Sequence, residues 1–155
     1  MKTTLYHRPL AQQGSVLLEG LISILLFSVG ILAIVGMQAA AIKNTTDAKY
    51  RADASYLANQ IIGQMWADRP NLLTYNNNAT AGTTPCNPAG PLSANLNVTS
   101  WLGAVATSLP NAVPSKQQIV VDAANHLVTV TLCWQSPQAT TAITWHNFAA
   151  TAQIY

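Results

Sequence analysis

The sequence contains very little charge. Asp, Glu, Lys and Arg make up only 8% of its 155 residues, against about 25% in an ordinary soluble domain. Such a composition excludes a strongly basic nucleic-acid-binding protein and a highly charged disordered chain. The formal net charge is +2, and no stretch of the chain concentrates its basic residues. We therefore expect no nucleic acid among its partners.

The sequence also lacks the patterns that carry enzymatic chemistry. His7, His126 and His146 do not belong to a paired-histidine, nucleophile–base or metal-ligand pattern. Beyond residue 60 the only carboxylates are Asp68 and Asp122, which are poor material for hydrolysis by paired carboxylates. No glycine-rich phosphate loop is present. The sequence therefore predicts a protein that is not an enzyme and that uses no metal or cofactor.

Cysteine is equally scarce. The chain has two cysteines, Cys86 and Cys133, and both follow the long hydrophobic segment described next. A single even pair behind a membrane segment suggests one disulfide in an oxidising compartment. The alternative is two free, buried thiols. A pair this far apart, without histidines at ligand spacing, does not form a zinc site.

The most prominent feature is a long hydrophobic segment over residues 15–42. Between Gly20 and Ile42 no residue is ionisable, and the only charge in the whole segment is Glu19. About 20 apolar residues are enough to span a bilayer as a helix. A helix that is apolar on every side is not suited to the surface of a soluble domain. The segment is therefore predicted to enter a membrane.

Two simple interpretations leave part of this segment unexplained. A secretory signal peptide would use the basic residues Lys2 and Arg8 and a cut near the small residues 39–41. However, its apolar region should measure about 7–15 residues, and it should not contain Glu19. A plain single-span anchor explains the length but not the carboxylate, which costs up to about 3 kcal/mol at the bilayer centre.

A third interpretation accounts for Glu19 by its distance from Gly14. Residues 14–19 read GSVLLE and resemble the type IV pilins, in which a polar leader ends in Gly and the apolar helix carries Glu at its fifth position. The resemblance implies that a prepilin peptidase cuts between Gly14 and Ser15 and N-methylates Ser15. Because a buried carboxylate needs a positive partner, Glu19 would pair with the free amine of a neighbouring subunit.

The helix is predicted to continue beyond the membrane segment. No proline occurs between Pro9 and Pro70, which predicts one helix over 15–69, about 80 Å long, ended by Arg69-Pro70. Its first half, residues 15–42, would span the membrane, and its second half would pack on a head domain. We expect this packing stripe to consist of Ala48, Ala52, Tyr56, Asn59, Ile62 and Trp66, widened by Leu57, Ile61 and Met65.

The remaining residues, 70–155, are predicted to form an α+β head. A loop over 70–98 precedes a short helix from Trp101 to Leu109. Strands follow at 119–121 and 127–134, and a last strand begins around Ile143 and Trp145, so the sheet has three or four antiparallel strands. Alternation places Val128, Val130, Leu132 and Trp134 on the face that packs, and places Cys133 on the other face, where it could reach Cys86. We expect all four tryptophans to serve the core.

The sequence resembles one group of pilins more specifically, the PilV family of minor pilins. The similar segments are 28–32 (SVGIL), 36–44 (GMQAAAIKN), 58–60 (ANQ) and 65–70 (MWADRP), with a weaker Cys133-Trp134. The resemblance implies the type IV pilin fold and a leader over 1–14. It implies a precursor in the inner membrane, with a periplasmic head, that later joins an extracellular pilus.

The resemblance also implies a role and a set of partners. The protein would help to prime pilus assembly and would remain near the pilus tip. Its partners would be other minor pilins, the major pilin, the prepilin peptidase and the inner-membrane assembly platform. Two alternatives stay open, namely a minor pseudopilin of a type II secretion system and a tip adhesin that binds a receptor through loop 70–98.

Overall fold

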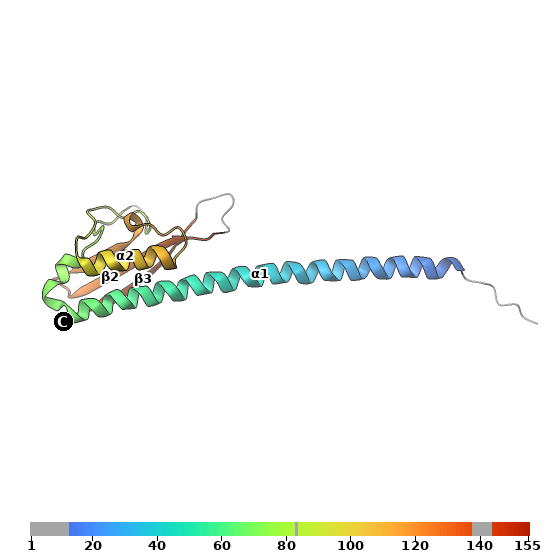
Figure 1. Cartoon of the computed structure of the whole chain (residues 1–155), viewed down its shortest axis with the longest axis horizontal. Helices are drawn as coiled ribbons and strands as arrows, with labels where there is room; N and C mark the ends of the chain where they lie inside the picture. The colour runs from blue at the N-terminus through green and yellow to red at the C-terminus, as the bar shows by residue number, and fades with distance from the viewer. Residues whose placement is uncertain (1–12, 83, 138–143) are drawn as a thin grey trace, which may run out of the picture. The chain divides into compact units, whose positions relative to one another are not determined.

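Two helices and a three-stranded antiparallel sheet make up the regular structure of the chain (Figure 1). The computed structural model describes residues 13–82, 84–137 and 144–155. The chain divides into two units, residues 1–44 and 45–155, and the second unit has the predicted α+β class. The elements are α1 (Gln13–Ala67), the 3-10 helix η1 (Arg69–Tyr75), α2 (Leu96–Ser108), the 3-10 helix η2 (Pro114–Lys116), β1 (Gln118–Asp122), β2 (Leu127–Gln135) and β3 (Trp145–Gln153).

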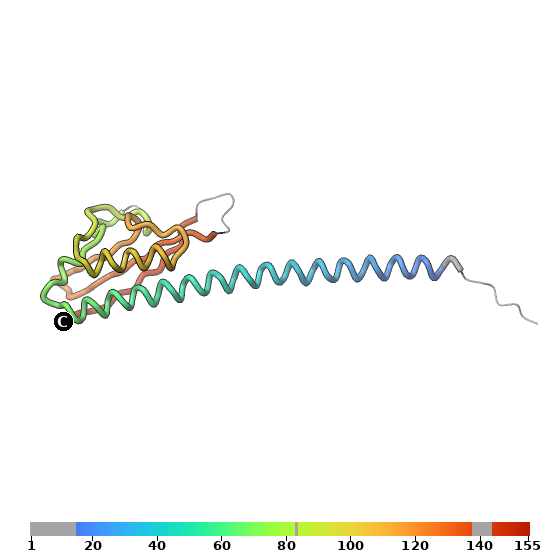
Figure 2. Tube along the Cα trace, viewed as in Figure 1, coloured from blue at the N-terminus to red at the C-terminus, as the bar shows by residue number. Residues whose placement is uncertain are grey.

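Helix α1 has 55 residues and contributes to both units. It begins at Gln13 and ends at Ala67, close to the predicted bounds of 15–69. Pro70 then lies in the first turn of η1, where the missing N–H of proline removes no helical hydrogen bond. Figure 2 shows the chain changing direction through η1 before it reaches α2. Of the predicted leader, residues 1–12 lie outside the described residues.

The buried stripe of α1 differs from the predicted one. Tyr56 is 69% exposed and Trp66 is 39% exposed, so the expected centre of the stripe is wrong. Ala48, Ala52 and Asn59 are exposed as well. The prediction is confirmed for Leu57, Ile61, Ile62 and Met65, which are buried, and Ala54 and Ala58 complete the buried stripe. The stripe is therefore rotated toward the aliphatic side of the helix, where small alanines allow close packing.

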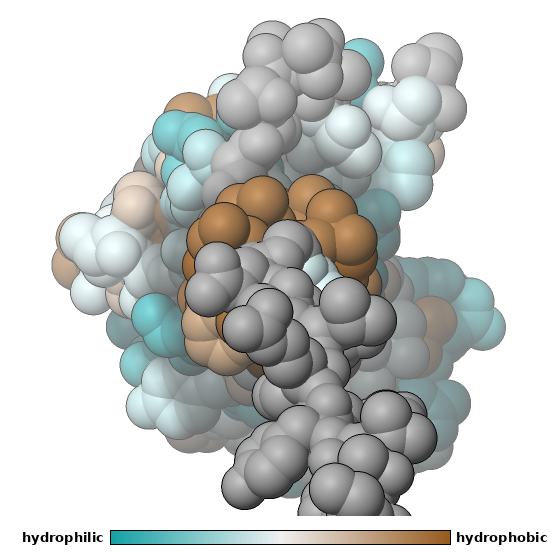
Figure 3. All heavy atoms as spheres, turned by 90° about the vertical axis from the view of Figure 1, so that its right-hand side faces the viewer, coloured by the Kyte–Doolittle hydropathy of each residue, from teal (hydrophilic) through white to brown (hydrophobic). Residues whose placement is uncertain are grey.

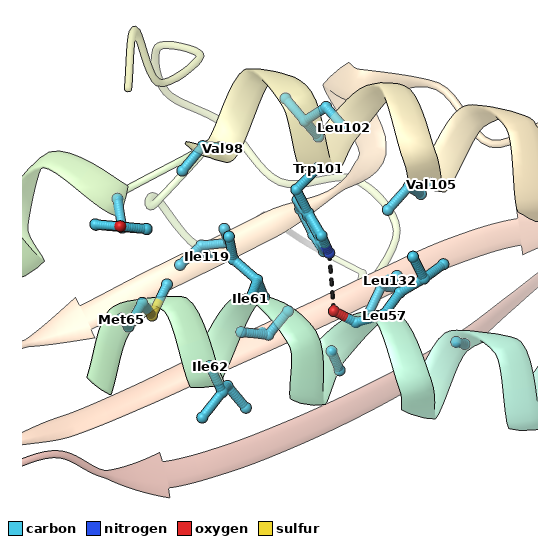
Figure 4. Packing of buried hydrophobic residues seen from close by; sticks show 14 of the residues in the cluster. Leu57, Ile61, Ile62, Met65, Val98, Trp101, Leu102, Val105, Ile119 and Leu132 are labelled. Carbon is cyan, nitrogen blue, oxygen red and sulfur yellow. Dashed lines mark hydrogen bonds between the residues drawn. The ribbon is translucent and has the colours of Figure 1, made fainter. Parts of the chain in front are cut away.

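One hydrophobic cluster joins this stripe to α2 and to the sheet (Figure 4). In β2 the alternate residues Val128, Val130, Leu132 and Trp134 are buried in this cluster, as the alternation predicted. Helix α2 lies directly against α1, as one hydrogen bond shows. The Trp101 indole N–H donates to the backbone carbonyl of residue 57 at 2.9 Å. The indole therefore fills the core and still satisfies its one donor.

The sheet has the order β1-β2-β3. All three predicted strands form, and each is slightly longer than predicted or shifted at one end. The last strand begins at Trp145, and Ile143 lies outside the described residues. Trp66 and Trp145, which were predicted to serve the core, lie outside the hydrophobic cluster. Trp66 is 39% exposed with the Arg69 guanidinium 4.8 Å from its ring, and Trp145 is half-buried with the Lys116 ammonium 5.7 Å from its ring.

The segment predicted as a plain loop over 70–98 is more regular than expected. Its first residues belong to η1, and residues 80 and 89 form an antiparallel bridge. Helix α2 begins at Leu96, five residues before Trp101, because the Asn95 side chain caps it by accepting from the Asn97 N–H at 2.8 Å.

Candidate functional site

The N-terminal part of α1 exposes an unusually large hydrophobic surface. Every residue from 15 to 45 is exposed, and the large apolar side chains from Val16 to Ile42 are between 47% and 74% exposed. In Figure 3 a group of hydrophobic (brown) residues is visible directly behind the grey N-terminal atoms. By length and composition, this helix is able to cross a membrane. An apolar surface of this extent needs a membrane or a protein partner around it.

The predicted processing and pairing residues lie at the start of α1. Gly14, Ser15 and Glu19 belong to its first turns, and the side chains of Ser15 and Glu19 are exposed. Because the two are four residues apart on a helix, they lie on the same face. The structure therefore presents the position of the predicted new amine and the carboxylate on one side of the apolar segment.

Glu19 differs from the other polar residues of this segment in having an unmet charge. The hydroxyls of Ser23 and Ser28 donate back to the carbonyls of residues 19 and 24, at 2.8 and 2.7 Å. In the described part of the chain no cation pairs with the Glu19 carboxylate. The first Lys or Arg there is Lys43, about 36 Å further along the helix. A carboxylate enclosed by apolar helices needs a cation beside it, and the described residues near Glu19 include no Lys or Arg that could supply one.

The head carries the predicted disulfide. Cys86 and Cys133 are bonded, with 2.09 Å between their sulfur atoms and 5.7 Å between their Cα atoms. Both residues are buried, yet neither belongs to the hydrophobic cluster on the other face of β2. The prediction of one disulfide is confirmed, and the alternative of two free thiols is wrong. The bond attaches the segment around residue 86 to the face of β2 that points away from the helices.

Three consecutive asparagines organise the edge of β1, which the sequence analysis did not foresee. The Asn76 side-chain oxygen accepts from the Val121 N–H at 2.8 Å. The side-chain amides of Asn77 and Asn78 both donate to the Gln117 carbonyl, at 2.8 and 2.9 Å. Asn77 also exchanges two backbone hydrogen bonds with residue 119. Three outward-facing groups of β1, the N–H and carbonyl of Ile119 and the N–H of Val121, are therefore bonded within the chain, although in sequence the triplet resembles only a turn.

Gln117 extends the ladder between β1 and β2 with its side chain. Its amide donates to the Cys133 carbonyl at 2.9 Å and accepts from the Cys133 N–H at 2.8 Å. This pair of bonds imitates a residue of a neighbouring strand. Gln117 is fully buried, so these bonds satisfy an amide that would otherwise be costly to bury. The disulfide thus starts from a residue whose backbone N–H and carbonyl are both hydrogen-bonded to the Gln117 side chain.

A cavity of about 290 Å³ lies beside η1. Apolar side chains contribute much of its lining, together with Arg69, Asp122 and His126. The Asp122 carboxylate is already engaged, because it accepts from the Asn125 side chain at 2.7 Å and from the N–H groups of residues 124 and 125. Hydrogen bonding from Asn125 lowers the pKa of Asp122 below its usual value. Its role is therefore to close the β1–β2 turn, and we assign no acid–base chemistry to the cavity.

The described residues contain no group of three or more His, Cys, Asp or Glu side chains that could hold a metal ion. His126 lies in the β1–β2 turn with a positive φ of 52°. The ring of His146 stacks on Trp134, with 5.9 Å between the ring centroids. His126 is exposed, and its ring lies 5.9 Å from that of Tyr155, while His146 is half-buried beside Trp134.

Comparisons of this chain with protein-family models, with curated proteins and with solved structures found no match. Inference about its role therefore depends on the residues and geometry described above.

Proposed function

We propose that this chain is a minor type IV pilin of the PilV family, which helps to prime pilus assembly and remains near the pilus tip. The observation that carries the proposal is the exposed, apolar first part of α1, with Gly14 before it and Glu19 as its one charge. A membrane anchor alone needs the apolar surface but not the carboxylate at that position. A pilin needs both, because the same helix first spans the membrane and then packs among other helices in a fibre.

The proposed mechanism begins with cleavage between Gly14 and Ser15 by the prepilin peptidase. The cut creates an amine at Ser15, and N-methylation by the same enzyme leaves that amine positively charged. The amine of one subunit then pairs with the Glu19 carboxylate of another as both become enclosed by apolar helices. An uncut precursor has no amine at this position, so cleavage would permit assembly.

Cleavage also changes the charge of the chain. Loss of the leader removes Lys2 and Arg8 and leaves five basic and five acidic side chains in the mature protein. Such a neutral chain suits a subunit that packs beside many similar subunits, because no net repulsion accumulates between them. In this proposal the precursor spans the inner membrane with a periplasmic head, and the assembly platform passes it to the pilus beside other minor pilins and the major pilin.

The N-terminus of the membrane-extracted protein from its own host tests the processing step. We expect intact-mass and N-terminal analysis to find a chain that starts at methylated Ser15. A chain that starts at Ile42 would indicate a signal peptide, and a chain that starts at Met1 would indicate a permanent anchor. Either of these results would overturn the proposal.

Changes at Glu19 test the pairing step. Glu19→Gln keeps the size of the side chain and removes its charge, and Glu19→Val removes its polarity as well. Both variants should still be cut after Gly14. Leaving an amine buried without its partner costs about 3–5 kcal/mol, so incorporation into sheared pili, measured by immunoblot, should fall at least tenfold.

Ser23→Val is the matched control for these variants, since it removes a polar side chain one turn away without changing charge. It should be incorporated as well as the wild type. Normal incorporation of Glu19→Val would show that the charge-pairing argument is wrong. If a Glu19 variant leaves pili normal but stops protein secretion, the chain belongs instead to a type II secretion system.

A further inference from the structure

The cavity of about 290 Å³ beside η1 is lined largely by apolar side chains. Val128, in this lining, is only 1% exposed, and Leu72 and Val121 pack against the hydrophobic cluster. Pro70 and Leu73 add further apolar surface. For comparison, a dry cavity of about 150 Å³ is enough to hold a benzene molecule. The space is therefore large enough for an aromatic ring with a short chain attached to it.

Most polar side chains of the lining are already occupied within the head. The Asn71 amide donates to the Asp68 carboxylate at 2.7 Å. The Thr74 hydroxyl donates to the Asn71 carbonyl and accepts from the Asn95 amide, both at 2.7 Å. The Asp122 carboxylate accepts three hydrogen bonds in the β1–β2 turn. A peptide bound here would find few partners for its amide groups, so the lining favours a ligand with a single polar group.

Arg69 differs from these residues, because its charge is unpaired. Within the described part of the chain, no carboxylate forms an ion pair with its guanidinium and no acceptor is hydrogen-bonded to it. The guanidinium lies over the Trp66 ring, with 4.8 Å between its central carbon and the ring centroid. Such stacking uses the flat face of the group and leaves the N–H groups in its plane free to donate. A carboxylate fits these N–H groups with two parallel hydrogen bonds.

A ligand with one negative charge suits this lining better than a ligand with two. The Asp122 carboxylate belongs to the same lining as Arg69, so it would repel a doubly charged phosphate group more strongly than a carboxylate. The exposed ring of His126 also borders the cavity, and an imidazole N–H is able to donate to a carboxylate oxygen. The apolar part of the lining remains available for the rest of the ligand.

We propose that this cavity binds a small organic acid, in which one carboxylate is attached to an aromatic ring or to a branched aliphatic group. The carboxylate pairs with Arg69, and the apolar group lies against Leu72, Val121 and Val128. The site is independent of the proposed function, because all of its residues belong to the head. None of them takes part in cleavage or in the pairing of Glu19.

Fluorine NMR tests the site with para-fluorophenylpropionate, titrated with the purified full chain in a non-ionic detergent. A titration with protein-free micelles corrects for probe that dissolves in the detergent. We expect a dissociation constant below about 1 mM. The alcohol para-fluorophenylpropanol has the same ring without the charge, and it should bind at least about tenfold more weakly because it cannot form the charged pair. Absence of binding by the acid, or equal binding of acid and alcohol, would overturn the proposal.

Two arginine variants test the charged contact. Arg69→Gln removes the guanidinium, so it should raise the dissociation constant of the acid at least about tenfold. Arg51→Gln is the matched control, because Arg51 is also exposed but lies outside the cavity lining. It should bind the acid as the wild type does. Equal affinities of the two variants would show that Arg69 does not hold the carboxylate.

Two alanine variants test the position of the apolar group. Ala123 is exposed and lines the cavity, so Ala123→Trp should reduce the space without replacing a core residue and should abolish binding. Ala124→Trp is the matched control, because the next residue is equally exposed but does not line the cavity. It should keep the wild-type dissociation constant. Unchanged binding by Ala123→Trp would place the probe elsewhere and refute the proposal.

A short peptide that ends in para-fluorophenylalanine carries the same ring and carboxylate on a polypeptide backbone. It should bind more weakly than the free acid, because its amide groups lose water and gain few partners in this lining. Tighter binding of the peptide would make the end of a protein chain the ligand and would overturn the proposal of a free acid. None of these measurements depends on pili or on N-terminal processing.

Discussion

The disulfide of the head allows a quantitative prediction. Cys86 and Cys133 are 47 positions apart in the sequence, and the chain-entropy relation for a loop of that length gives a stabilisation of about 4 kcal/mol. Changing both residues to alanine removes this constraint from the unfolded chain. Because folded domains are stable by only about 5–15 kcal/mol, the change should be large but should not by itself unfold the head.

Other contacts would keep the same segment in place without the disulfide. Residues 80 and 89 exchange two backbone hydrogen bonds of 2.9 Å, and the Asn78 N–H donates to the Pro91 carbonyl at 3.0 Å. The Ser93 N–H donates to the Asn77 side chain at 3.0 Å. We therefore expect the double variant to fold to the same structure and to melt about 15 °C below the wild type, at about 4 °C for each kcal/mol.

The assay is thermal unfolding of the full chain in detergent, followed by tryptophan fluorescence. Trp101 and Trp134 are each only 2% exposed, so their emission should shift when the core opens. Wild-type protein melted with a reductant is the control, since it loses the covalent link but keeps both sulfur atoms. If the double variant and the reduced protein both melt within about 3 °C of the oxidised wild type, the polar contacts hold the segment and the entropic reasoning is refuted.

Two further changes test the polar contacts around β1. Asn77→Ala removes two side-chain hydrogen bonds of a fully buried residue and leaves the Gln117 carbonyl and the Ser93 N–H with fewer partners. Urea unfolding should therefore show a free energy of unfolding lower by about 2–4 kcal/mol. The control Asn87→Ala, at an exposed residue, should lower it by about 0.5 kcal/mol or less. Asp122 has a lowered pKa in the folded chain, so its stabilisation is complete above its unfolded pKa of about 4 and disappears as the pH falls through its folded pKa. Asp122→Ala should therefore be less stable than the wild type at neutral pH and should approach it in acid, and an equal difference at both pH values would contradict this assignment.

The local features of this protein could be predicted from its sequence. The apolar run over 15–42, the helical periodicity after it and the absence of proline between Pro9 and Pro70 together predict one long helix, because each residue of a helix bonds only to near neighbours. The alternation along 127–134 is sufficient for a strand with one apolar face, because side chains alternate across a strand. The spacing of Gly14 and Glu19 is likewise a linear property, so it is visible before any folding is considered.

Other features depend on contacts between distant residues, and only the tertiary structure decided them. The predicted stripe of α1 had the right spacing, but which of its flanking residues are buried depends on what α2 and the sheet place against the helix, so Ala54 and Ala58 are buried and Tyr56 and Trp66 are exposed. The asparagine triplet contacts residues about 40 positions away, so nothing nearby in the sequence distinguishes it from an ordinary turn. The same holds for the position of β3 at one edge of the sheet. An edge is a property of the whole sheet, and a strand's own sequence does not say whether another strand lies beside it.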